Sequence, residues 1–313
     1  MTIPFIFFGT PEFCIDTLDI LASAGHIPTA IVCQPDRPKG RGRKVAPLPV
    51  KEWAQTRFIR VIQPNQCKHE DFLDCLIELE PELGLVFAFG QLLPKQLLDI
   101  PRLGFINIHP SILPRYRGAA PLQWALINGD SETGVSILKV TPRLDDGDII
   151  LQEKVAIDPD ENAVELGNRL ARLGGELVVQ VLDRLAAGNV AAVPQGEDQV
   201  IWAPALTKSD GKIDWNQTTE SIHNRIRGVQ PWPGAFTHLG EKILKIHKAG
   251  PAVVAQTEGR QPGQVIEAAG TSLVVATLDG GLALAEVQLE GKKRLDAKAF
   301  LLGRTIQKGD ILR

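Results

Sequence analysis

The 313-residue chain lacks any run of about 18 uninterrupted apolar residues, the length that a membrane-spanning helix requires. It has only four cysteines, all within the first 75 residues, and no two of them form a Cys-x-x-Cys pair. We therefore expect neither a disulfide framework nor a zinc ribbon, and a reducing cytoplasm is the expected setting. The opening segment Met1–Gly9 has no basic residue before its apolar run, so a signal peptide is not expected.

Two common phosphate-binding motifs are also missing. The chain contains no GxxxxGK[ST] segment, and its first glycine turn, Gly9-Thr10-Pro11, does not continue as GxGxxG. Neither a P-loop nor a bound dinucleotide is therefore indicated. Cys67, His69 and Cys75 could be taken for metal ligands, but they lack a second ligand pair. We interpret them as part of a helix and its cap, and we expect no metal.

Hydrophobic residues make up 44% of the chain, which is enough for a packed core, and the length suits about two domains. The charge is uneven. Residues 208–313 carry 15 Lys and Arg against 11 Asp and Glu, whereas residues 1–207 carry 19 against 26. A basic second part beside an acidic first part is compatible with contact to a polyanion, although chance alone can produce such a drift.

Short apolar runs alternate with helical patterns through the first half of the chain. This rhythm predicts a Rossmann-like α/β domain, with a mostly parallel sheet covered by helices on both faces. Two further strands are expected on either side of the turn Asp145-Asp146-Gly147, followed by a long helix near Ala163–Leu185. The expected core strands are Phe5–Phe8, Ala30–Cys33, Gly84–Phe87 and Phe105–Ile108.

The pattern changes after this helix. Residues 188–207 lose helical periodicity and contain several Gly and Pro, which predicts a linker. Short strands with close turns then predict a small sandwich or β-barrel domain over residues 208–313. Lys212–Trp215 is expected to be its first strand. The predicted division is thus a catalytic domain over residues 1–187, a linker over 188–207 and a second domain over 208–313.

The densest polar cluster, Asn107-Ile108-His109-Pro110-Ser111, follows an apolar strand. Alternation along a strand puts Asn107 and His109 on the same side, and strand ends line the ligand crevice of an open parallel sheet. An Asn amide can stabilise an oxyanion and an imidazole can accept a proton, so the pair suits acyl transfer. The alternative is a turn-forming Asn beside a core His that bonds to the backbone.

A second polar cluster, Leu144-Asp145-Asp146-Gly147-Asp148, surrounds a glycine turn. One interpretation is a solvated acidic turn. The other is a loop that directs one carboxylate at His109, fixing the tautomer of the imidazole and stabilising an imidazolium. The spacing of further acidic residues does not fit a calcium loop.

The segment Gln34–Lys44 carries five basic residues in eight positions: Arg37, Lys39, Arg41, Arg43 and Lys44. Glycines and prolines lie among them. The functional interpretation is a loop that grips phosphates of a nucleic acid. The alternative is a solvated cationic loop.

Two motifs together resemble the folate-dependent formyltransferases. The first is Asn107-x-His109-x-Ser111-x-Leu113-Pro114-x-x-Arg117-Gly118, and the second is Leu144-Asp145-x-Gly147-Asp148. Within this family the chain is most similar to the members that formylate methionyl initiator tRNA. The features that carry this closer resemblance are Gly9-Thr10-Pro11-Glu12-Phe13, the basic segment with its continuation to Lys51, and Ile226-Arg227 followed by Pro231-Trp232-Pro233-Gly234-Ala235.

The resemblance implies roles for individual residues. Asn107, His109 and Asp145 match the catalytic trio of the family. Asp146 stands where Thr is frequent, but the position directly after Leu144 favours Asp145 as the carboxylate that faces His109. Ser111, Ile112, Leu113 and Pro114 match the stretch that contacts the folate. The region around Arg41 matches a loop that enters the acceptor arm of tRNA. The C-terminal domain would be an oligonucleotide-binding-type (OB-like) barrel along the tRNA.

The implied reaction transfers formyl from 10-formyltetrahydrofolate to the α-amine of methionine on initiator tRNA, without a metal. The alternatives are a formyltransferase acting on glycinamide ribonucleotide or on a nucleotide-sugar amine, a 10-formyltetrahydrofolate hydrolase, and a non-catalytic RNA-binding protein. None of the alternative enzymes needs the basic segment, and a non-catalytic protein would not need the trio. We expect a cytoplasmic monomer with tRNA and folate as partners.

Overall fold

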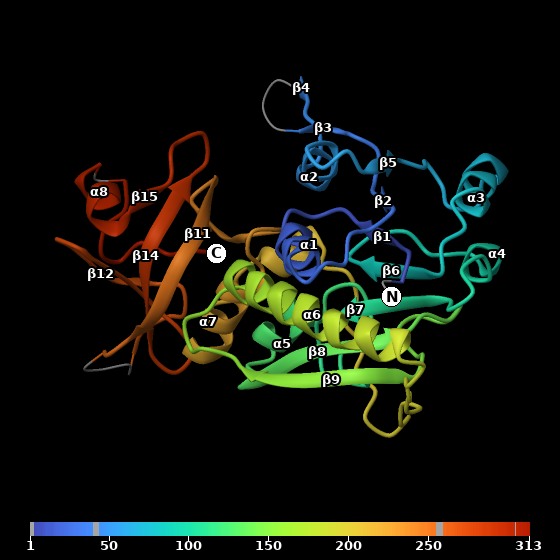
Figure 1. Ribbon diagram of the computed structural model, residues 1–313. Coiled ribbons are helices and arrows are strands. Elements are labelled where there is room, and N and C mark those ends of the chain that lie inside the picture. The colour runs from blue at the N-terminus through green and yellow to red at the C-terminus, as the bar shows by residue number, and fades with distance from the viewer. Residues whose placement is uncertain (1–2, 40–43, 255–258, 304) are drawn as a thin grey trace. The chain divides into compact units, whose positions relative to one another are not determined.

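The computed structural model describes residues 3–39, 44–254, 259–303 and 305–313 (Figure 1). The chain divides into two compact units. The first extends as far as Pro121 and also includes Thr133–Val155 and Gly167–Ala203. The second comprises Leu122–Glu132, Ala156–Leu166 and Pro204–Arg313. No helix in the described ranges combines the length and the apolar character needed to cross a bilayer.

The first unit is built on a seven-stranded sheet in the order β5-β2-β1-β6-β7-β8-β9. The pairs from β5 to β7 are parallel, whereas β8 runs antiparallel to β7. The strands are β1 (Phe5–Gly9), β2 (Ala30–Val32), β5 (Arg60–Ile62), β6 (Leu83–Phe87), β7 (Phe105–His109), β8 (Glu132–Lys139) and β9 (Ile149–Ala156). The helices are α1 (Cys14–Ser23), α2 (Pro49–Gln55), α3 (Glu70–Ile77), α4 (Lys95–Leu98) and α6 (Ala163–Ala186), of which α6 begins in the second unit. The mostly parallel α/β fold expected from the sequence is confirmed.

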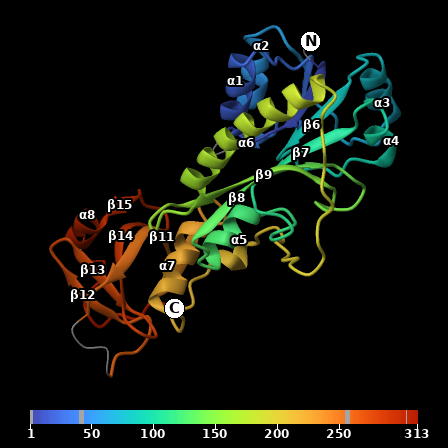
Figure 2. The same cartoon turned by 60° about the horizontal axis from the view of Figure 1, so that its bottom comes forward.

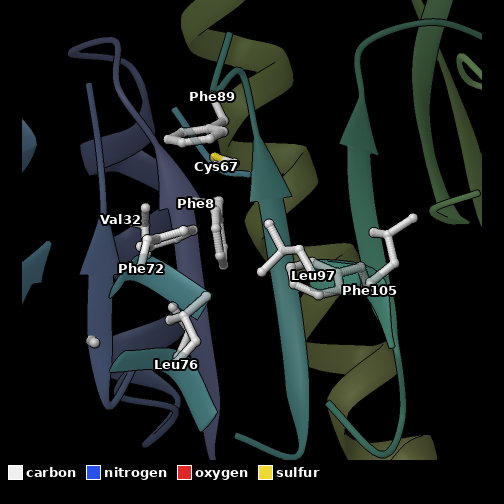
Figure 3. Close-up of a cluster of buried hydrophobic side chains, with 11 residues drawn as sticks. Phe8, Val32, Cys67, Phe72, Leu76, Phe89, Leu97 and Phe105 are labelled. Carbon is white, nitrogen blue, oxygen red and sulfur yellow. The ribbon is translucent and has the colours of Figure 1, made fainter. Parts of the chain in front are cut away.

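A cluster of aromatic and aliphatic side chains joins one face of this sheet to α3 and α4 (Figure 3). Phe8 lies at its centre, with edge-to-face contacts to Phe72, Phe89 and Phe105 at ring-centroid distances of 5.3–6.5 Å. Each such pair contributes about 0.5–1.5 kcal/mol of stability beyond what the burial of its surface area provides. The cluster therefore fixes β1, β2 and β7 against α3 and α4.

The other face of the sheet is covered by α6 (Figure 2). A Cβ on Gly174 of α6 would lie 2.6 Å from Ile108 Cγ2, so helix and strand approach closely there. Because Phe105 and Ile108 face opposite sides of the sheet, alternation along β7 puts Asn107 and His109 on the side of Phe105. These two side chains therefore lie on the face opposite α6.

The direction of strand addition reverses at β1. The chain adds β2 and then β5 on one side of β1, and adds β6 and β7 on the other. In open α/β sheets, ligands bind at the carboxyl ends of the strands beside such a switch point. The loops after β1 and β6 meet there, because the Thr10 hydroxyl donates to the Phe89 carbonyl at 3.3 Å. His109 ends the neighbouring strand β7.

The second unit contains an antiparallel sheet in the order β10-β11-β14-β13-β12, and β15 pairs with β14. Its strands are β10 (Ala235–Leu239), β11 (Lys242–Ala252), β12 (Val265–Ala269), β13 (Ser272–Ala276), β14 (Gly281–Leu289) and β15 (Leu295–Asp296). The helices are α5 (Pro121–Ile127), α7 (Thr219–Gly228) and α8 (Ala297–Leu302).

The end of the chain closes this sheet into a barrel. Leu312 bridges Leu239 at the end of β10, and Ile311 bridges Gln264 beside β12, so one segment pairs with both edge strands. Closure removes the unpaired edges that an open sheet would expose. The expected C-terminal β-barrel is thus confirmed, whereas the expectation of a strand over Lys212–Trp215 is wrong. A 3-10 turn, Lys208–Gly211, ends there, and only Lys212 pairs, with Phe236 of β10.

The second unit includes segments from the first half of the sequence, and their packing explains why. A Cβ on Gly228 of α7 would lie 2.8 Å from Ile127 of α5. The buried Arg227 guanidinium donates to the carbonyl oxygens of Asp158 and Glu161 at 3.3 and 3.2 Å. α7 thus holds α5 and the turn before α6 within one unit.

Candidate active site

The end of β7 presents Asn107 and His109 at the carboxyl edge of the sheet. Asn107 is half-buried, whereas His109 is only 3% exposed. His109 Nε2 lies 2.9 Å from the carbonyl oxygen of Tyr116. Because a carbonyl oxygen can only accept, Nε2 carries a hydrogen and Nδ1 is the ring nitrogen left for other chemistry.

Asp145 brings a carboxylate to both of these side chains. Its Oδ2 lies 3.6 Å from His109 Nδ1, and its Oδ1 accepts a long 3.4 Å hydrogen bond from Asn107 Nδ2. The Gly118 amide donates to the same Oδ2 at 2.9 Å. The structure therefore gathers Asn107, His109 and Asp145 into one cluster. His109 is both bound to the backbone, as the structural alternative expected, and paired with a carboxylate.

Asp146 faces away from the histidine. Its carboxylate accepts a hydrogen bond from the Thr141 hydroxyl and pairs with the guanidinium of Arg143, both within the same turn. The sequence favoured Asp145 by its position directly after Leu144, and Asp145 is the residue whose carboxylate lies 3.6 Å from His109 Nδ1. A φ of +50° at Asp145 sets this orientation, because that backbone conformation directs the two neighbouring side chains to different partners.

The segment Ser111–Pro114 continues directly from the site. The Ser111 hydroxyl donates to the Arg115 carbonyl at 2.7 Å, and Leu113 is 3% exposed. The side chain of Gln152 donates to the Leu113 carbonyl at 3.1 Å. Ser111 and Leu113 thus shape the loop with buried side chains, while Ile112 and Pro114 are half-buried.

The basic segment forms the hairpin of β3 (Pro38–Lys39) and β4 (Lys44–Val45), in which Lys39 pairs with Lys44. Arg37 before it is exposed. Arg41 and Arg43, two of the five basic residues singled out in the sequence, lie outside the described residues. The backbones of Lys39 and Lys44 therefore lie opposite each other in this pair of strands.

A polar network holds the segment that leads into this hairpin. Lys51 Nζ donates to Asp36 Oδ2 at 2.6 Å and to Gln63 Oε1 at 2.9 Å. Gln63 Nε2 donates to Asp36 Oδ1 and to the Gln34 carbonyl. The hydrogen bonds from Lys51, then from Gln63, lower the pKa of Asp36. The approach to the basic hairpin is thus anchored to α2 and to the residue after β5.

The sulfur residues do not assemble into a metal centre in the described part of the chain, where no three His, Cys, Asp or Glu side chains group closely enough to share an ion. Cys67 is buried, and burial raises the pKa of its thiol to about 12. His69 is the residue at the N-terminal cap of α3. His69 matches the expected cap and Cys75 lies within α3, whereas Cys67 lies in the turn before them.

Sequence reasoning missed one residue that contacts the Asp145 turn. Gln195 lies in the stretch expected to be a linker, yet its side chain donates to the carbonyl oxygens of Asp145 and Gly147 at 2.9 and 2.7 Å. No local pattern marks it, because the contact joins residues 50 positions apart. Arg117, by contrast, belonged to a motif, but only the structure shows that it bonds to Gln195.

Residues 1–182 match the family model "Formyl transferase", and residues 205–305 match "Formyl transferase, C-terminal domain". The chain is 47% identical to a methionyl-tRNA formyltransferase of Pelobacter propionicus, covering 98% of this chain and 95% of the relative. It is equally similar to the enzyme of that name from Geotalea uraniireducens, covering 98% and 97%.

Two solved structures share the fold at low sequence identity. HypX from Aquifex aeolicus in complex with tetrahydrofolic acid is 17% identical, with a TM-score of 0.69 over 100% of this chain and 51% of that chain. An N-formyltransferase from Helicobacter canadensis, in complex with folinic acid and dTDP-3-aminofucose, is 17% identical, with a TM-score of 0.64 over 90% and 98%.

Proposed function

The chain belongs to the formyl transferase family, and we propose that it transfers the formyl group of 10-formyltetrahydrofolate to the α-amino group of methionine on initiator tRNA. The observation that carries this proposal is the 47% identity to methionyl-tRNA formyltransferases along 98% of the chain. That similarity includes the C-terminal barrel as well as the cluster at the end of β7. The similarity therefore supports the choice of acceptor as well as the choice of formyl donor.

The side chains at the end of β7 fit a formyl donor. A formyl group offers an oxygen that needs a hydrogen-bond donor, and the half-buried Asn107 amide can provide one. When bound, 10-formyltetrahydrofolate would supply a formyl carbon on N10, the arylamine nitrogen that leaves in the reaction. We assign Ser111, Ile112, Leu113 and Pro114 to holding it. Ile112 and Pro114 offer half-buried apolar surface, and the buried Ser111 and Leu113 set the path of the backbone.

Asn107 is assigned to the oxygen of the formyl group. That oxygen gains negative charge as the amine adds to the formyl carbon, and a fixed amide donor stabilises the charge. The present hydrogen bond from Asn107 Nδ2 to Asp145 is long, at 3.4 Å. Exchanging it for a shorter bond to an oxyanion therefore costs little.

His109 and Asp145 are assigned to the proton. Nε2 of His109 is engaged by the Tyr116 carbonyl, so Nδ1 is the atom that accepts the proton lost by the attacking amine. The Asp145 carboxylate lies 3.6 Å from Nδ1 and balances the charge of the resulting imidazolium. The same imidazolium then returns the proton to the leaving nitrogen and adds to the stabilisation of the oxyanion.

The basic hairpin supports a tRNA acceptor. Arg37, Lys39, Arg41, Arg43 and Lys44 supply positive charge for phosphates, which dominate the affinity of proteins for nucleic acids. Formyl transfer to a nucleotide-sugar amine, or release of formate, would use the same trio without needing this charge. The solved sugar N-formyltransferase shares only the fold with this chain, at 17% identity.

The arrangement of the parts follows from this reaction. We assign residues 1–187 to catalysis, 188–207 to the connection and 208–313 to a barrel that lies along the tRNA. The net charge of residues 208–313, 15 basic against 11 acidic residues, suits that contact. One copy of the chain carries every assigned residue, so a monomer is proposed, working in the cytoplasm where initiator tRNA is used.

The test is formyl transfer from 10-formyltetrahydrofolate by the purified full-length chain, with four acceptors in parallel. These are methionyl initiator tRNA, methionyl elongator tRNA, a UDP-amino sugar and water. The proposal expects rapid formylation of the initiator tRNA alone. Transfer to the sugar, or formate release without tRNA, would contradict the assigned acceptor while leaving the chemistry of the trio in place. A His109→Asn variant is the control for enzyme-dependent turnover.

A further inference from the structure

The turn that carries Asp145 is held from outside by the side chain of Gln195. This residue uses both hydrogens of its amide, donating to the Asp145 carbonyl at 2.9 Å and to the Gly147 carbonyl at 2.7 Å. Asp145 itself adopts a φ of +50°, which non-glycine residues seldom populate. A strained residue persists only where its surroundings hold it, and these two bonds act on the carbonyl group of Asp145 and on that of Gly147, two residues further on.

The other end of the same amide is also engaged. Gln195 Oε1 accepts a 3.0 Å hydrogen bond from Arg117 Nε, and the Arg117 side chain is 5% exposed. The main chain of Arg117 is fixed as well, because it exchanges hydrogen bonds with Ile201 and Ala203. Gln195 is therefore oriented by a buried partner whose main chain is itself hydrogen-bonded. Its amide cannot rotate without breaking all three bonds.

This partner leads directly to the carboxylate. Gly118 follows Arg117, and its amide donates to Asp145 Oδ2, the oxygen that lies 3.6 Å from His109 Nδ1. Gln195 thus connects the two places that determine where Asp145 lies: the peptide that carries the residue and the segment that binds its carboxylate. The backbone near Gln195 is tied down too, because Val193 pairs with Ile149 at the start of β9.

We propose that Gln195 is a positioning residue of the formyl transfer reaction, holding the Asp145 carboxylate at the distance from His109 that the reaction requires. The inference rests on the proposed function and goes beyond it, because Gln195 touches neither the formyl group nor the amine. It acts through Asp145. A displacement of about 1 Å at a catalytic group can lower the rate on the order of 100-fold. The loss of the hydrogen bonds from Gln195 should therefore lower kcat.

The experiment compares two substitutions of Gln195 in the full-length enzyme. Gln195→Glu keeps an oxygen for Arg117 but presents no amide hydrogens to the two carbonyl groups, and Gln195→Met removes all three bonds at similar size. We expect kcat to fall by roughly 10- to 100-fold in both, while KM for methionyl initiator tRNA and for 10-formyltetrahydrofolate stays within about threefold. Glu197→Gln is the matched control, since Glu197 is exposed and lies 3.7 Å from Arg117. It should retain the parent kcat.

A double-mutant cycle with Asp145→Asn separates positioning from a general loss of stability. If Gln195 acts through Asp145, then Gln195→Glu should change kcat by less than about threefold once Asp145 is already Asn. Additive losses would overturn the proposal, as would a parent kcat in both Gln195 variants. Failure of both variants to fold, monitored by circular dichroism, would assign Gln195 to stability and overturn it as well. If the parent chain formylates none of the acceptors, the proposed function itself fails, which is a different result.

Discussion

Asp145 and Asp146 are adjacent in sequence but differ in every interaction that bears on catalysis. Asp145 faces His109 and Asn107, whereas Asp146 is bound by Thr141 and Arg143. We therefore expect Asp145→Asn to lower kcat by roughly 10²-fold or more, because the imidazolium loses its counter-charge. Asp146→Asn, the matched control, should keep kcat within about threefold. Equal losses in the two variants, measured as formylation of methionyl initiator tRNA, would contradict the assignment.

Asn107 and His109 supply the donor and the base in the proposed chemistry. Removing either side chain, in Asn107→Ala or His109→Ala, should reduce kcat by roughly 10²–10³-fold, because a fixed oxyanion donor and a positioned base each contribute about that much. Both proteins should fold, which far-ultraviolet circular dichroism would check. A parent turnover number in either folded variant would remove that residue from the mechanism.

The sequence alone predicts part of this constellation. Alternation along β7 puts Asn107 and His109 together, because side-chain direction in a strand follows from position. The choice of Asp145 over Asp146 came from its position after Leu144 in the family motif and not from periodicity, since no local pattern demands the positive φ at Asp145. Gln195 is harder still to find, because its bonds join backbone groups about 50 residues away and glutamine has no preferred site chemistry.

The turn between β8 and β9 depends on a close approach of two backbones at Gly147. A Cβ there would lie 1.8 Å from the Lys139 carbonyl oxygen, so the backbone must move to accept any side chain. We expect Gly147→Ala to destabilise the protein by about 2 kcal/mol or more, a cost in the range of overpacking, and to lower kcat by displacing Asp145. The control is Gly196→Ala, where no described heavy atom beyond the residue itself and its two chain neighbours lies within 4 Å of the added Cβ. Chemical denaturation of the two variants would measure the difference, and similar midpoints would argue against this interpretation of the turn.

The anchor before the basic hairpin titrates at acidic pH. Lys51 and Gln63 lower the pKa of Asp36 below its ordinary 3.8, so the folded state prefers the carboxylate. This contribution is fully present above that value and is lost as the pH falls through the lowered pKa of the folded state. Asp36→Asn should therefore reduce thermal stability at pH 6 and show a smaller further loss between pH 4 and pH 2 than the parent chain. A parallel loss in both proteins would show that Asp36 makes no such contribution.

The hairpin itself should govern the salt dependence of tRNA binding. Neutralising Arg41, Arg43 and Lys44 should weaken binding and reduce the slope of log K against log salt by up to about three, roughly one for each phosphate that the variant no longer binds. KM for 10-formyltetrahydrofolate should hardly change. A control variant that neutralises the exposed Lys68, Lys95 and Lys154 changes the net charge equally. An equal change of slope in both variants would indicate a general charge effect and not binding by the hairpin.

The chain as a whole is organised less simply than its composition suggested. The hydrophobic pattern of the sequence separates an α/β half from a strand-rich half. The strands of the mixed sheet lie in the first half and those of the barrel in the second. The compact units do not, since α5 and the turn before α6 belong to the unit that contains the barrel. Their attachment depends on tertiary contacts, such as Arg227 with the carbonyl groups of Asp158 and Glu161, and periodicity along the chain carries no information about them.

The stability of the second unit should depend on pH in two separate ranges. Burial, followed by the charge of Arg227, lowers the pKa of His223 below 6.5, although Asp160 at 3.7 Å partly opposes this shift. The unfolded chain therefore binds a proton more readily than the folded one, and stability declines as the pH falls below about 6.5. Asp210, Asp214 and Asp279 also have lowered pKa values, owing to hydrogen bonds from their neighbours. Their contribution is retained until the pH falls below about 3.8.

Substitution of the histidine should affect only the upper window. We expect the midpoint of thermal unfolding of the parent chain to fall between pH 7.5 and pH 5, and the fall to be smaller in His223→Gln, which has no titrating side chain at that position. Burial also lowers the pKa of His247, so the unfolding midpoint of the variant should still fall slightly as the pH decreases over this range. Calorimetric scans across this range measure the effect, and scans between pH 4 and pH 2 provide the control, where both proteins should lose stability equally. Identical profiles in the upper window would mean that His223 is protonated as easily in the folded chain as in the unfolded one, and that the packing of α7 does not control this titration.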